Sequence, residues 1–106
     1  MGSHGQIQEG GRMKKLLGSL EQLDPACYAE IERGLAQVDI EYGEDIIQGA
    51  CQRAVAARGW NWQVQSWDEM TSIAYVVGDG REEKSQADSP ANALLTCYLK
   101  AIEAQP

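Results

Sequence analysis

The segment that most constrains the fold is Trp60 to Gly80, WNWQVQSWDEMTSIAYVVGDG, because it contains all three tryptophans and the clearest strand patterns. Apolar and polar residues alternate from Trp60 onward, which is the period of a β-strand. One face of this strand is expected to carry Trp60, Trp62 and Val64. The other face is expected to carry Asn61, Gln63, Gln65 and Trp67.

A second strand is predicted over Thr71 to Val77, which is rich in β-branched and aromatic residues. The polar residues 68–70 turn the chain between the two strands, and Gly78-Asp79-Gly80 ends the second. Both faces of this strand are apolar, with Ala74 and Val76 on the outer side. The inner side, expected to pack on helices with the tryptophans, carries Ile73, Tyr75 and Val77. Arg81 to Ala87 is either a charged edge strand or a loop.

The rest of the chain is predicted to be helical. Helices are expected over Lys14 to Leu23, from Pro25 to about Gln37 behind the N-cap Asp24, and from Glu44 to a C-cap at Gly59, with a linker at 39–43. Ser89 and Pro90 open the last helix. We therefore predict an α+β fold, with helices packed on a small antiparallel β-hairpin sheet in the order α-α-α-β-β-(β)-α.

The first twelve residues resemble an expression tag or leader, and we expect residues 1–12 to be disordered. Residues 13–106 are expected to form a single α+β domain. His4 is the only histidine of the chain, so if residues 1–12 are a tag, the native protein has no histidine.

The net charge of −7 and the lack of a basic patch argue against nucleic acid or an anionic membrane as partners. No apolar run approaches the length needed to span a membrane, and no signal peptide is evident. The widely spaced Cys27, Cys51 and Cys97 indicate reduced, buried thiols. A cytoplasmic protein is therefore expected.

No catalytic, cofactor-binding or metal-binding residue can be nominated. Histidine-based catalysis and histidine-ligated zinc lack an internal histidine, and no CxxC pair offers a thiolate site. Gly78-Asp79-Gly80 lacks the spacing of a phosphate-binding loop. Four acids gather at Asp39, Glu41, Glu44 and Asp45. Their spacing does not match an EF-hand, so a solvated acidic surface is favoured over a cation site or a glycosidase pair.

The order of a tryptophan-bearing strand, a second strand, a polar connection and a helix opening on residues 87–95 (ADSPANALL) resembles small phage-type ABA sandwich domains. The resemblance covers about residues 44–104, and the helices from Leu16 to Gln37 have no place in it. It implies a phage or mobile-element origin. That family has no agreed catalytic residues, so no functional residue is carried over.

Three functions remain open. The first is a non-enzymatic interaction protein, most simply a homodimer, which contacts a second copy or another protein through the hairpin's outer face. That interface is expected to comprise Gln63, Gln65, Trp67, Ala74 and Val76. The N-terminal helices could instead cover this face. The second function is a small-molecule binding domain, with a pocket lined by Trp60, Trp62 and Tyr98. The third is an acidic mimic of nucleic acid.

Overall fold

The computed structural model of this chain describes residues 3–38 and 43–104, with side chains described from residue 13. Its elements are α1 (Ser3–Leu23), α2 (Pro25–Leu35), α3 (Gly43–Ala57), β1 (Asn61–Asp68), β2 (Thr71–Gly78), β3 (Arg81–Ala87) and α4 (Pro90–Glu103). The predicted α+β fold and element order are confirmed, and Arg81–Ala87 is a third strand. Of the linker expected at 39–43, residues 39–42 lie outside the described residues, and Gly43 is the first residue of α3.

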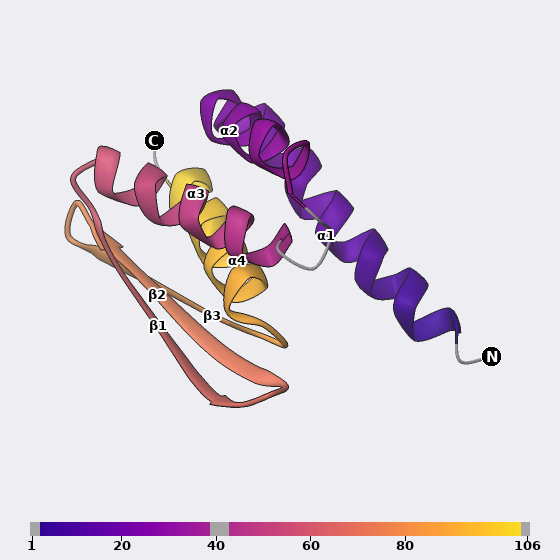
Figure 1. The fold of residues 1–106 in the computed structure, drawn as a ribbon. Coiled ribbons are helices and arrows are strands. Elements are labelled where there is room, and N and C mark those ends of the chain that lie inside the picture. The colour runs from indigo at the N-terminus through magenta and orange to yellow at the C-terminus, as the bar shows by residue number, and fades with distance from the viewer. Residues whose placement is uncertain (1–2, 39–42, 105–106) are drawn as a thin grey trace.

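The elements form three layers, as Figure 1 shows. The antiparallel sheet has the strand order β1-β2-β3. Helices α3 and α4 lie against one face of it, and α1 and α2 pack on the far side of those two helices. The alternative in which the N-terminal helices cover the outer face of the sheet is therefore wrong. That face has no helix over it among the described residues.

Local side-chain and backbone hydrogen bonds fix the starts of α2 and α4 and the end of α3 where the sequence predicts them. The Asp24 carboxylate accepts from the Cys27 amide at 3.1 Å, and the Ser89 hydroxyl accepts from the Asn92 amide at 3.2 Å. Each cap satisfies an amide that has no partner within its helix. Gly59 has a positive φ of 78° behind α3, where the Trp60 amide donates back to the Val55 carbonyl at 3.1 Å. This Schellman motif ends the helix and delivers Trp60 to the sheet.

Helix α1 begins much earlier than expected, at Ser3 instead of Lys14. The two glycines at positions 10 and 11 lie inside the helix. Glycine disfavours a helix interior by only about 1 kcal/mol per residue, so it lowers helix propensity without forbidding a helix.

The two β-turns differ in the strand pairing next to them: it is regular at the β2–β3 turn and contains a bulge at the β1–β2 turn. At the β2–β3 turn, Asp79 and Gly80 have positive φ values of 53° and 77°, the pattern of a tight type I′ hairpin. At the β1–β2 turn, Asp68 pairs with Thr71, but the next pair is Ser66 with Ser72. Trp67 is therefore an extra residue, a β-bulge that shifts the register by one.

This bulge inverts the predicted faces of β2. Val64 lies opposite Ala74 and not opposite Tyr75, and directly opposed residues share a face. Ala74 and Val76, with exposed fractions of 0 % and 1 %, lie under α4. Residues Ile73, Tyr75 and Val77 lie on the uncovered face. Both assignments for β2 were wrong, because a one-residue slip moves every side chain of a strand to the opposite face.

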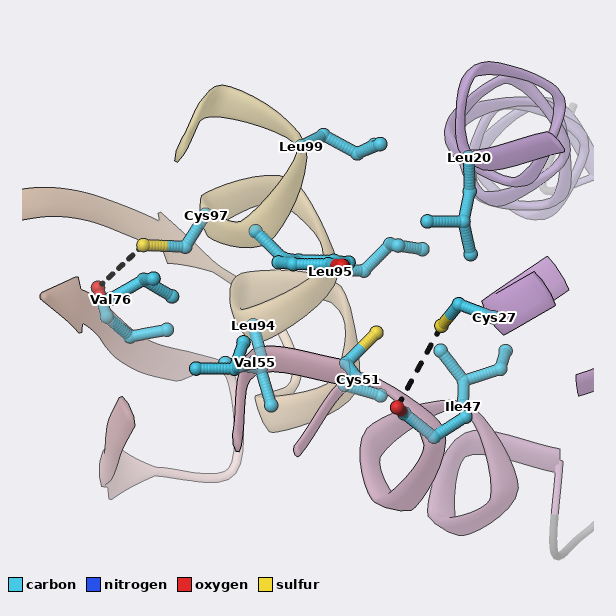
Figure 2. Packing of buried hydrophobic residues seen from close by; sticks show 14 of the residues in the cluster. Leu20, Cys27, Ile47, Cys51, Val55, Val76, Leu94, Leu95, Cys97 and Leu99 are labelled. Atoms are coloured by element: carbon cyan, nitrogen blue, oxygen red, sulfur yellow. Dashed lines mark hydrogen bonds between the residues drawn. The ribbon is translucent and has the colours of Figure 1, made fainter. Parts of the chain in front are cut away.

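The core lies between the sheet and the helices, and α4 is its centre. The apolar stripe of this helix is buried in full: Ala91, Leu95, Tyr98, Leu99 and Ile102. The three cysteines are also buried and free, as predicted. Figure 2 shows Cys97 directed toward β2 and Cys27 directed toward α3. Their thiols lie within hydrogen-bonding reach of the Ala74 and Ala50 carbonyls respectively.

Candidate functional site

The exposed large hydrophobic side chains concentrate on the β1–β2 hairpin. Among the residues whose side chains are described, Trp67 and Met70 are each 68 % exposed, Trp62 is 40 % exposed and Val77 is 39 % exposed. The remaining example, Val38, lies after α2 and away from the sheet. A cluster of this kind is typical of a contact surface, whereas single exposed apolar residues are common on any protein.

The uncovered face of the sheet has an apolar centre with polar flanks; we call this surface the open face. By the strand register it carries Asn61, Gln63 and Gln65 from β1, Ile73, Tyr75 and Val77 from β2, and Glu82, Lys84 and Gln86 from β3. The Lys84 ammonium lies 5.8 Å from the centre of the Tyr75 ring, a cation–π distance. Charged groups therefore lie along β3, while the β1 side of the open face is neutral.

The predicted interface residues fall into two groups. Gln63 and Gln65 lie on the open face, and Trp67 projects from the bulge near the hairpin tip. Ala74 and Val76 are core residues beneath α4 and cannot meet a partner. The open-face residues Ile73, Tyr75 and Val77 were missed. The alternation within each strand is clear from the sequence, but the bulge sets the register between the strands. That register determines which residues of β2 share a face with Gln63 and Gln65.

The predicted pocket residues Trp60, Trp62 and Tyr98 do not line one cavity. The rings of Trp60 and Tyr98 pack edge to face, with centroids 6.5 Å apart, inside the core. Trp62 lies on the outer strand of the sheet and is partly exposed. Neither Trp62 nor Tyr98 lines the groove beside Trp60. That groove has a volume of about 540 Å³ and is lined by Trp60, Val76, Gly78, Asp79, Arg81, Glu83, Ala101 and Ala104.

A chain of hydrogen bonds joins the C-terminal end of α3, the middle of α4 and the N-cap of α2. The Arg58 guanidinium lies 5.3 Å from the Trp60 ring centre and donates from Nε to the Tyr98 hydroxyl at 2.9 Å. That hydroxyl donates to the Asp24 carboxylate at 2.5 Å. Burial, followed by the bond to Asp24, raises the pKa of Tyr98 well above its usual range. Tyr98 therefore stays neutral and holds α2, α3 and α4 together.

The thiols of the chain are poorly suited to nucleophilic chemistry. Burial raises the pKa of Cys97 to about 11. A hydrogen bond with Cys27, together with burial, raises the pKa of Cys51 well above its usual value. The thiolate is the reactive form, so both side chains are held in the unreactive state. No group of three potential metal ligands occurs among the residues that the structure describes.

Comparison of the chain with protein-family models, with curated proteins and with solved structures finds no match. Within the described ranges, no helix combines the length and the apolar character needed to cross a membrane. The geometry of the hairpin therefore carries the functional proposal.

Proposed function

We propose that this protein is a non-enzymatic interaction protein that self-associates as a homodimer through its hairpin sheet. The observation that carries the proposal is the concentration of exposed Trp62, Trp67, Met70 and Val77 on one hairpin, one face of which has no helix over it among the described residues. Apolar and aromatic side chains without formal charges are typical of the centre of a protein–protein interface. A place in the cytoplasm and an origin in a phage or other mobile element belong to the same proposal.

The polar groups near the hairpin support an interaction role over catalysis. The Tyr98 hydroxyl accepts a hydrogen bond from Arg58 and donates one to Asp24. The Trp60 indole N–H donates to the Asp79 carboxylate at 3.1 Å. Groups that already have partners in the folded chain contribute to packing and orientation. The open face offers neutral amides and aromatic surface, which suit recognition of a protein surface.

Replacing the most exposed tryptophan with an acid tests the proposal. Trp67→Glu is expected to convert a dimer into a monomer while the helical signal in far-UV circular dichroism is retained, because a charge in an apolar contact is desolvated without a partner. Sedimentation velocity measures the change. The matched control is Val38→Glu, an exposed apolar residue away from the hairpin, which should leave the dimer intact. A wild-type protein that is monomeric at every accessible concentration would contradict the proposal.

A second candidate function is binding of a small molecule in the groove beside Trp60, favoured by the groove's volume of about 540 Å³ and its mixed apolar and charged lining. A Trp62→Phe/Trp67→Phe variant leaves Trp60 as the only tryptophan. A compound from a fragment collection that fills the groove is expected to change the Trp60 fluorescence saturably. Ala101→Phe, which blocks the groove without adding a tryptophan, should abolish that change. An unchanged spectrum across the collection would count against this function.

A further inference from the structure

The two edges of the sheet differ sharply in charge. Strand β3 forms one edge and carries four charged residues: Arg81, Glu82, Glu83 and Lys84. Strand β1 forms the other edge and has no formal charge from Asn61 to Trp67. Charged side chains on an edge strand discourage pairing with another strand, and a long neutral edge permits it. Only the β3 edge is protected in this way.

No described element lies beyond β1 in the plane of the sheet, as Figure 1 shows. An edge strand directs alternate N–H and C=O groups away from its neighbour, and these groups can form a further ladder. The exposed side chain of Trp62 lies at this same edge. Strand β1 therefore combines free backbone hydrogen-bonding capacity, apolar surface and neutrality over seven residues, 61–67.

We propose that β1 pairs with β1 of a second copy, antiparallel about a two-fold axis, so that two sheets join into one of six strands. This inference rests on the proposed self-association and specifies its geometry. Each copy has a net charge of −7, so two copies repel one another except where the approaching surfaces are neutral. The β1 edge provides such a surface, and a two-fold contact needs only one kind of surface.

Pairing centred on Val64 gives a register that the side chains fit. It places Trp62 opposite the partner's Ser66 on the helix-covered side, where the small serine leaves room for the indole. It places Gln63 opposite the partner's Gln65 on the open face, where the two amides can exchange hydrogen bonds. Main-chain bonds supply the affinity of such strand addition, and the side chains set the register.

Amide hydrogen exchange distinguishes edge pairing from contact through the open face. In the full-length dimer, alternate amides of residues 61–66 are expected to exchange at least about tenfold more slowly than in the diluted monomer, because only pairing with a second strand protects them. In a dimer formed through the open face, the outward-directed amides of β1 would exchange at the same rate as in the monomer.

A pair of glutamine variants provides the matched test. Gln63 and Gln86 are both exposed and both on the open face, but Gln63 lies on the β1 edge and Gln86 on the β3 edge. Edge pairing predicts that Gln63→Lys weakens dimerisation about tenfold or more, since an edge lysine opposes strand pairing. Gln86→Lys and Val77→Lys are expected to leave the dimer intact.

The remaining outcomes separate the two proposals. A dimer that Val77→Lys dissociates, with exchange of β1 amides unchanged by dilution, overturns edge pairing and leaves self-association in place. A dimer indifferent to all three substitutions likewise overturns edge pairing and places the contact elsewhere. A wild-type chain that stays monomeric overturns the proposed function, and edge pairing with it.

Discussion

A Trp60→Ala variant is expected to lose about 3–5 kcal/mol of unfolding free energy, the usual cost of removing a large aromatic side chain from a core. Trp60 is only 7 % exposed, and its ring packs against the Tyr98 ring. The ring also lies directly on the backbone of Gly78, where a Cβ atom would come within 2.1 Å of it. Rigid backbone on one side and α4 on the other leave little scope for the cavity to collapse.

Trp62→Ala is the matched control for this prediction. Trp62 is the same residue type two positions away but is 40 % exposed on the edge strand, so its loss is expected to cost about 1 kcal/mol or less. Urea unfolding of both variants, at a concentration where sedimentation shows monomer, gives the comparison. Equal losses from the two substitutions would contradict the different burial of the two tryptophans.

The two tryptophans also show that the sequence predicts the face of the sheet on which a side chain lies but not how deeply it is buried. Alternation placed both tryptophans on the helix-covered side, and the register agrees with this for Trp62, which lies opposite the buried Val76. Alternation says nothing about distance from the sheet edge, which depends on strand order. Trp60 precedes the strand and enters the core through the Schellman motif, whereas Trp62 stands on a strand with a neighbour on one side only.

Three helix ends were predicted well because their signals are local. Asp24-Pro25, Ser89-Pro90 and Gly59 each act within one turn of their own backbone, and each lies where the sequence indicates. The register of β1 against β2 is different in kind, because it depends on how many residues the turn absorbs. One bulged residue, Trp67, transferred Ala74 and Val76 from the predicted interface to the core.

The predicted interface therefore combined residues of β1 that are exposed with residues of β2 that are buried. Gln63, Gln65 and Trp67 remain exposed on the hairpin, since their own strand sets their direction. The residues of β2 were chosen by assuming a register between β1 and β2. Because both faces of β2 are apolar, the sequence pattern is compatible with either face being buried. For a strand that is apolar on both faces, the number of residues in the turn decides which face packs on the helices.

The bulge decides which of two neighbouring valines, Val76 or Val77, is buried. Val76 is 1 % exposed beneath α4, and Val77 is 39 % exposed on the open face. Val76→Asp is expected to cost about 4 kcal/mol or more and to leave the chain largely unfolded at neutral pH, because it removes a carboxylate from water beneath α4. Val77→Asp keeps its carboxylate in water and is expected to cost about 1 kcal/mol.

Far-UV circular dichroism and urea unfolding of the two variants, as monomers, test the register in solution. The expected result is a folded Val77→Asp protein beside a destabilised Val76→Asp protein. Lowering the pH toward 4 should partly restore Val76→Asp, since protonation removes the buried charge and an ordinary aspartate has a pKa of about 3.9 that burial raises. The reverse pattern, with Val77→Asp unfolded and Val76→Asp stable, would mean that β1 and β2 pair without the bulge at Trp67. In that case Ala74 and Val76 would return to the outer face.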